Sequence, residues 1–207
     1  YQLYRNHDAG PESEIAKVFR RENSFDVSHI KLIGVWDTVG SLGIPLHAFQ
    51  WINKRKYSFY DTTLSSIVEY AYHAISVDER RGNFKPTLWE KSTNKARDFE
   101  QVLEQRWFAG VHSNVGGGYP DEGLADIALR WLIDKSASTG LAFDADRIVS
   151  EVKSNVEGTL YNSLKGVFAL LPTHERAITT GVIDESVYKR IKKVPGYNPK
   201  NVNGSHV

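Results

Sequence analysis

The sequence predicts an α/β fold with a doubly wound, mostly parallel sheet. Two β-rich runs, 30–36 and 102–108, each end at turn residues, and helical patterns lie between and after them. Strands that alternate with helices pair in parallel, because each helical crossover returns the chain to the same end of the sheet. Functional groups in such sheets gather beyond the carboxyl ends of the strands.

Two helices are predicted in the first part of the chain, each from its own local pattern. Pro11 lies in the first turn of a short helix whose apolar residues recur at helical spacing up to Phe19. Ser66 and Glu69 form a capping-box pattern ahead of an apolar run, which predicts a helix over about 66–77.

Two more helices are predicted after the second β-rich run. Apolar residues from Leu124 to Leu132 recur at helical spacing, which is the clearest amphipathic pattern in the chain. Asp144 can cap a further helix that has Val149 on its buried side. The remaining segment, 160–207, mixes short apolar runs with prolines, and we assign it as a C-terminal extension.

The composition fits a single domain over 1–207. A chain of 207 residues with 41% hydrophobic residues can bury one sizeable core. Its formal net charge of +1 is spread along the chain and leaves no basic footprint for nucleic acid. The absence of cysteine excludes disulfides and thiolate metal sites. No apolar run reaches the roughly 18 residues that span a bilayer, so we expect a soluble protein without a transmembrane segment.

A histidine lies where the second β-rich run meets a glycine-rich loop. His112 follows the apolar run from Trp107 and precedes Gly116, Gly117 and Gly118. A catalytic base needs a rigid support behind it and open backbone around it, and a strand that runs into a glycine-rich loop supplies both. Taken alone, His112 fits a hydrogen-bonded structural histidine better, so the catalytic hypothesis depends on its neighbours.

An aspartate occupies the matching place after the first β-rich run. Asp37 follows Trp36 and leads through Thr38 into a turn marked by Gly40 and Gly43. Taken alone, Asp37 could simply cap that turn, as aspartate often does. The chain order of acid and then base matches the last two members of an α/β-hydrolase triad, in which a serine comes first.

The nucleophile of such a triad is missing from the chain. No G-x-S-x-G motif occurs, and neither Ser41 nor Ser113 has the glycine spacing that a nucleophile elbow requires. The chain also begins at Tyr1 without a methionine. We therefore interpret it as the C-terminal portion of an α/β-hydrolase catalytic domain, trimmed or processed from a longer polypeptide.

Other polar residues have weaker functional claims. Glu69 and His73 lie four positions apart on a predicted helix, but a metal site would need a third ligand, so we expect a solvent-facing or partly buried pair. Asp78 and Glu79 are expected to end that helix and to bind nothing, although Asp78 is a reserve candidate for the triad acid. A metal-dependent hydrolase, in which His73 joins the acid and the base as ligands, is an alternative.

Four ordered motifs together resemble a bacterial and fungal α/β-hydrolase family that includes the type VI secretion phospholipase effectors. They are VWDTVGSLGIP, EYAYHAISVDERRGNFKPTLW, WFAGVHSNVGGGYPDEGLADIALRWLIDK and GYNPKNV, and the resemblance extends from Tyr1 to about Val202. It implies that Asp37 is the triad acid and that His112 is the triad base. In that family the serine elbow lies upstream of the position that corresponds to Tyr1 of this chain.

The same resemblance implies a serine hydrolase that acts on lipid or other acyl esters without a metal or a cofactor. Its expected partners are the ester substrate and a secretion-apparatus or immunity protein, and its expected location is the bacterial cytoplasm or, after type VI secretion, outside it. The loops that support the pair would contain Trp36, Thr38, Ser113, Asn114, Gly116, Gly117 and Gly118.

Family members often have aspartate where this chain has Asn114. That aspartate has one of two roles. In the first it tunes the imidazole or holds an ion, and in the second it only shapes the loop, where asparagine is a good substitute. Both readings stay open at the level of sequence.

A non-catalytic module is the main alternative function. A pseudo-hydrolase or truncated binding module would keep the fold and would have no upstream elbow. A doubly wound sheet without its leading strands would also expose an unpaired edge and apolar helix faces.

Overall fold

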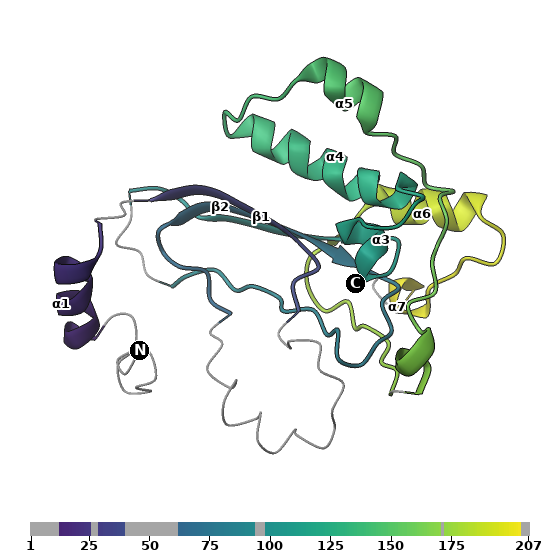
Figure 1. Cartoon of the computed structure of the whole chain (residues 1–207), viewed down its shortest axis with the longest axis horizontal. Helices are drawn as coiled ribbons and strands as arrows, with labels where there is room; N and C mark the ends of the chain where they lie inside the picture. The colour runs from purple at the N-terminus through teal and green to yellow at the C-terminus, as the bar shows by residue number, and fades with distance from the viewer. Residues whose placement is uncertain (1–12, 26–28, 40–61, 94–97, 171, 204–207) are drawn as a thin grey trace.

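A four-stranded sheet forms the centre of the computed structural model, which describes residues 13–25, 29–39, 62–93, 98–170 and 172–203 (Figure 1). The strands are, in their order across the sheet, β1 (Ile30–Trp36), β2 (Val68–Ser76), β3 (Val102–Phe108) and β4 (Val182–Ile183). Every neighbouring pair is parallel. The predicted α/β fold with a parallel sheet is therefore confirmed, and β1 and β3 have the bounds that their residue patterns predict.

Helices precede the sheet, cover it and surround its carboxyl end. Figure 1 shows the longest one, α4, along the sheet with α5 outside it, while α1 lies near the opposite end of the strands from α3. The helical elements are α1 (Glu14–Asn23), α3 (His112–Gly116), α4 (Gly123–Ser138), α5 (Ala145–Glu151), the 3-10 helix η2 (Gly166–Leu170), α6 (Glu185–Lys193) and α7 (Lys200–Asn203). Among the described residues, no helix has both the length and the apolar character to cross a membrane.

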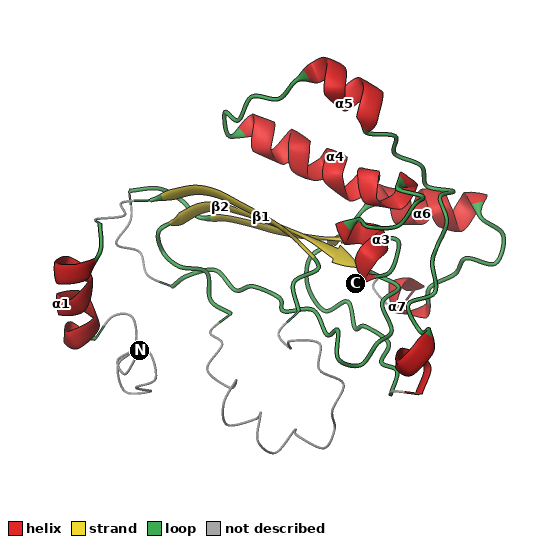
Figure 2. Ribbon diagram, in the orientation of Figure 1, coloured by secondary structure: helices red, strands yellow, loops and turns green. Residues whose placement is uncertain are grey.

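The helix predicted over 66–77 is wrong, because this segment contains strand β2 (Figure 2). β2 lies between β1 and β3, and all its residues from Ala71 to Ser76 are buried. A central strand of a parallel sheet is covered on both faces, so it has no polar face and its apolar run resembles that of a buried helix. Glu69 does not cap a helix but accepts hydrogen bonds from Lys31 and contacts His29.

Two layers of side chains cover the two faces of the sheet. On one face, Trp131 and Leu132 of α4 pack with Tyr72, Ala74 and their neighbours. The absence of a side chain at Gly34 lets α4 approach, since a Cβ there would lie 3.3 Å from Leu132 Cδ2.

The other face is covered by the C-terminal segment. Ile75 and Trp107 pack there with Val187 of α6 and Val202 of α7, and all four side chains are almost completely buried. The described part of segment 160–207, which the sequence analysis assigns only as a C-terminal extension, thus contributes to the core.

The outer helices differ in part from their predictions. Asp144 caps α5 as predicted, since its Oδ1 accepts the N–H of Arg147 at 3.0 Å. Val149 was expected on a buried side, but it is 72% exposed because α5 lies outside α4 and not on the sheet. Helix α1 begins after the cap Ser13, and Pro11 lies outside the described residues.

Replacement of Ile75 by alanine should lower the free energy of unfolding by about 2–5 kcal/mol, because it leaves a cavity in the centre of the sheet. Val149→Ala on the exposed face of α5 is the matched control and should change stability by less than about 0.5 kcal/mol. Denaturant unfolding of both purified variants measures the difference. Equal effects would contradict the central, buried position of β2.

Candidate active site

Asp37 lies directly after β1, at the carboxyl end of the sheet. Its side chain is buried, and its backbone φ is 42°, in the left-handed region that few non-glycine residues adopt. Two hydrogen bonds to β2 hold this turn: the Asp37 N–H donates to Ala74 O at 2.7 Å, and the Ser76 N–H donates to the side-chain Oδ1 of Asp37 at 2.9 Å. Unusual backbone of this kind persists where the surrounding structure enforces it, as here from β2.

His112 is the first residue of the short helix α3, not part of an extended glycine loop. Gly110 makes the tight turn from β3 into this helix, with a φ of 125° and no space for a side chain against Asn114. Gly117 and Gly118 end the helix with φ values of 87° and 105°. Gly117 and Gly118, which the sequence predicts to be part of an open loop, thus terminate a helical turn that carries the histidine.

The structure brings the side chains of Asp37 and His112 together. His112 Nδ1 lies 2.6 Å from Asp37 Oδ2, although the residues are 75 positions apart. An ionised carboxylate only accepts, so Nδ1 carries a proton, and in the neutral form of the ring Nε2 then has a free lone pair. The imidazole is 32% exposed, and Nε2 has no hydrogen-bond partner among the described residues. The geometry suits a base whose outer nitrogen is open to a reacting group.

Arg176 is the site residue that the sequence analysis missed. Its Nη1 donates to Asp37 Oδ1 at 2.5 Å and its Nη2 donates to Asp37 Oδ2 at 3.0 Å, so the carboxylate is held by a two-armed ion pair. The guanidinium is buried and also donates to Ser76 O. No local pattern marks Arg176, because its partner lies 139 positions earlier in the chain.

The carboxyl group of Asp37 stays ionised despite its burial. Burial alone would raise its pKa, but the hydrogen bonds from His112 and Arg176 and the positive charge of Arg176 outweigh it. The pKa of Asp37 falls from its ordinary 3.8 to about 2. Asp37 can therefore compensate a positive charge on the imidazole at any pH near neutrality.

His73 supports the turn after Asp37 and lies on a strand, contrary to the predicted helical pair with Glu69. Its ring is completely buried; Nε2 accepts the N–H of Thr38 at 3.0 Å, and Nδ1 lies 3.4 Å from Gln105 Oε1. Burial lowers the pKa of His73 to about 4, so the ring is neutral. Its lone pair is occupied by the Thr38 N–H, and no group of three metal-ligating side chains occurs among the described residues.

Asn114 holds the histidine turn against a later segment of the chain. Its Oδ1 accepts the N–H groups of Val111 at 3.3 Å and Tyr161 at 3.2 Å, while its Nδ2 donates to Thr159 O at 3.0 Å. A carboxylate at this position could not donate to Thr159. Of the two roles left open for this position, these contacts are those of a residue that shapes the loop.

Two expectations about the end of β2 are wrong. Asp78 and Glu79 follow a strand instead of ending a helix, and each binds a main-chain group: Asp78 Oδ2 accepts the Gly110 N–H at 2.6 Å, and Glu79 Oε2 accepts the His112 N–H at 3.2 Å. Burial raises the pKa of Asp78. Both carboxylates bind main-chain groups of the histidine turn, whereas the imidazole itself contacts Asp37.

Two aromatic side chains lie near the pair. Trp36 is 39% exposed, and Gly116 packs against it, since a Cβ on that glycine would lie 3.7 Å from Trp36 Cβ. The ring of Phe84 meets the His112 imidazole edge to face at a centroid distance of 5.1 Å. Ser113 is partly buried in the first turn of α3.

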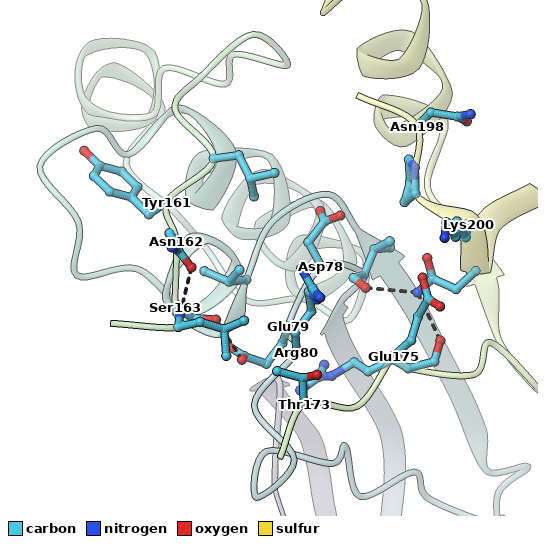
Figure 3. Close-up of a pocket in the computed structure, with 17 residues that line it drawn as sticks. Asp78, Glu79, Arg80, Tyr161, Asn162, Ser163, Thr173, Glu175, Asn198 and Lys200 are labelled. Atoms are coloured by element: carbon cyan, nitrogen blue, oxygen red, sulfur yellow. Dashed lines mark hydrogen bonds between the residues drawn. The ribbon is translucent and has the colours of Figure 1, made fainter. Parts of the chain in front are cut away.

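A polar cavity of about 660 Å³ lies behind the histidine turn (Figure 3). Figure 3 shows Asp78 and Glu79 near its middle, with Thr173 on one side and Asn198 and Lys200 on another. Arg176 also lines it, whereas Asp37 and His112 do not. The C-terminal segment forms part of the cavity wall, and Arg176 connects that wall to Asp37.

The low pKa of Asp37 makes stability dependent on acid. The folded-state value of about 2 lies below the ordinary 3.8, so the stabilisation is complete above about pH 4 and is lost as the pH falls toward 2. We expect a loss of roughly 2 kcal/mol over this range. Unfolding titrations at several pH values should show it, whereas Asp37→Asn should lack this component and the exposed control Asp134→Asn should retain it. An Asp37→Asn variant with the full acid dependence would contradict the assigned pKa.

Comparison with known proteins places the chain in a family. The model of the family described as "T6SS, Phospholipase effector Tle1-like, catalytic domain" matches residues 2–135, more than half of the 207 residues. No curated protein and no solved structure matches the chain. The matched segment contains both Asp37 and His112. The chain belongs to the Tle1-like catalytic-domain family of type VI secretion phospholipase effectors.

Proposed function

We propose that the chain supplies the acid and the base of a Ser-Asp-His triad that hydrolyses acyl esters of phospholipids. The observation that carries this proposal is the 2.6 Å contact between His112 Nδ1 and Asp37 Oδ2, which lies at the carboxyl ends of parallel strands. Membership in a family of phospholipase effector catalytic domains supports the substrate class.

In this mechanism, His112 acts first as a base and then as an acid. Its Nε2 takes the proton of the serine hydroxyl as the oxygen attacks the ester carbonyl, and it later donates that proton to the leaving alcohol. Asp37 orients the imidazole and compensates its positive charge. Arg176 fixes the Asp37 carboxylate through both guanidinium arms.

We assign the nucleophile to a serine upstream of Tyr1, within a G-x-S-x-G turn. The arrangement of the sheet supports this position, because β1 has a strand partner only in β2 among the described residues. A further parallel strand beside β1 would end next to Asp37. One oxyanion donor would be the N–H that follows the serine, and another would come from an earlier loop.

The family also suggests where the enzyme acts. We propose that it is exported by type VI secretion, that its substrate is membrane phospholipid of a target cell, and that an immunity protein restrains it in the producing cell. A pseudo-hydrolase that only binds would show none of the activity that the following experiments measure.

In the intact protein, His112→Ala should lower kcat for phospholipid hydrolysis by about 10⁴- to 10⁶-fold, because serine loses its base. Asp37→Asn should lower it by about 10⁴-fold through the wrong imidazole tautomer. Release of fatty acid from phospholipid vesicles measures both. His174→Ala is the matched control, since this histidine is exposed and has no contact with Asp37.

A loss of less than tenfold in His112→Ala would remove His112 from the mechanism. No hydrolysis of any phospholipid or simple ester by the wild-type protein would instead favour the binding module.

The coding sequence upstream of Tyr1 should contain a G-x-S-x-G motif between a β-rich run and a helix. Replacement of its serine by alanine should abolish hydrolysis as completely as His112→Ala does, because members of a triad act as a unit. Absence of the motif would leave Asp37 and His112 without a nucleophile.

A further inference from the structure

Glu79 is a buried carboxylate that the mechanism above does not use. Its side chain is completely buried and accepts three hydrogen bonds from Arg81: the main-chain N–H at 2.8 Å and Nε at 3.0 Å on Oε1, and Nη2 at 2.9 Å on Oε2. It also accepts the His112 N–H at 3.2 Å and the Ser163 hydroxyl at 2.9 Å. One carboxylate thus joins the end of β2, the start of α3 and the C-terminal segment.

The first connection to the proposed base runs through the main chain. His112 is the first residue of α3, and the first N–H groups of a helix have no partner within the helix. Glu79 accepts this N–H, while Asp78 accepts the Gly110 N–H two residues earlier at 2.6 Å. Two consecutive carboxylates therefore hold the turn that carries the imidazole.

The second connection runs through aromatic packing. The ion pair with Glu79 places the guanidinium carbon of Arg81 at 3.4 Å from the centroid of the Phe84 ring. The Phe84 ring meets the His112 imidazole at 5.1 Å and an interplanar angle of 75°. Glu79 therefore constrains the backbone of His112 directly and one face of its ring through Arg81 and Phe84.

We propose that Glu79 is a positioning residue for His112, which holds the imidazole so that Nδ1 stays on Asp37 and Nε2 stays aimed at the nucleophile. This inference rests on the proposed function, in which His112 is the base. Glu79 touches neither substrate nor reacting atoms in this role. Displacement of a catalytic group by about 1 Å can lower the rate by about 10²-fold. Loss of the two connections from Glu79 to His112 should therefore lower the rate if it displaces the imidazole by such a distance.

In the intact protein, Glu79→Ala should lower kcat by about 10²-fold and leave KM within about twofold, because substrate binding does not involve the carboxylate. Glu79→Gln retains the side-chain volume and one acceptor oxygen for the His112 N–H, but it loses the ion pair with Arg81. We expect a loss of about tenfold for this variant, which also tests the proposal where the alanine variant does not fold.

Glu104→Gln is the matched control, because Glu104 is a partly buried carboxylate of β3 that pairs with two cations, Arg106 and Lys135, and has no contact with the histidine turn. It should retain wild-type kcat per folded molecule, with folding monitored by circular dichroism and thermal unfolding. A Glu79→Gln variant that retains wild-type kcat, or an equal loss in Glu104→Gln, would overturn the proposal.

A measurement without turnover separates this inference from the proposed function. The proton on His112 Nδ1, hydrogen-bonded to Asp37, should give a downfield NMR signal in wild type and in Glu104→Gln. The signal should be lost in Asp37→Asn and lost or broadened in Glu79→Ala and Glu79→Gln. An unchanged signal in both Glu79 variants would contradict the positioning role, whereas a wild-type protein that shows the signal but hydrolyses no ester would contradict only the proposed function.

Discussion

The buried carboxylate of Asp37 is the interaction on which the rest of the site depends. It receives His112 from the end of β3, Arg176 from the C-terminal segment and the Ser76 N–H from β2. A buried charge is costly unless it is paired and hydrogen-bonded, and these three partners together meet that requirement. The hydrogen bonds from His112 and Arg176 and the charge of Arg176 keep the pKa of Asp37 low despite burial, which leaves the carboxylate able to orient an imidazole and compensate its charge.

Parallel pairing explains why these groups meet. β1, β2 and β3 all end at the same side of the sheet, so Asp37, Asp78 with Glu79, and His112 follow three adjacent strands. Each strand end contributes a different part: the first leads to Asp37, the second leads to two carboxylates that accept main-chain N–H groups of the histidine turn, and the third leads to the imidazole of His112. The C-terminal segment closes the arrangement with Arg176 and Ser163.

Neutral and charged groups have separate tasks in this arrangement. His73 is buried and uncharged beneath the Asp37 turn, where its Nε2 fixes the Thr38 N–H. Asn114 satisfies main-chain groups of two segments with one amide. The imidazole of His112 is the partly exposed group among them, with its outer nitrogen open. A hydrogen-bonded polar support under one accessible ring suits the ester hydrolysis that the family membership supports.

The sequence by itself determined the parallel α/β class, the bounds of β1 and β3, helix α4 and the Asp144 cap, because local periodicity and turn residues carry that information. It also indicated the pairing of Asp37 with His112, through the motifs in which the two residues lie. Only the tertiary structure decided that 68–76 is a strand, since burial on both faces removes the polar alternation that would mark it. It also decided the exposure of Val149 and the contacts of Arg176 and Glu79. Arg176 and Glu79 form hydrogen bonds with residues up to 139 positions away in the chain, and contacts over such a distance produce no pattern in the local sequence.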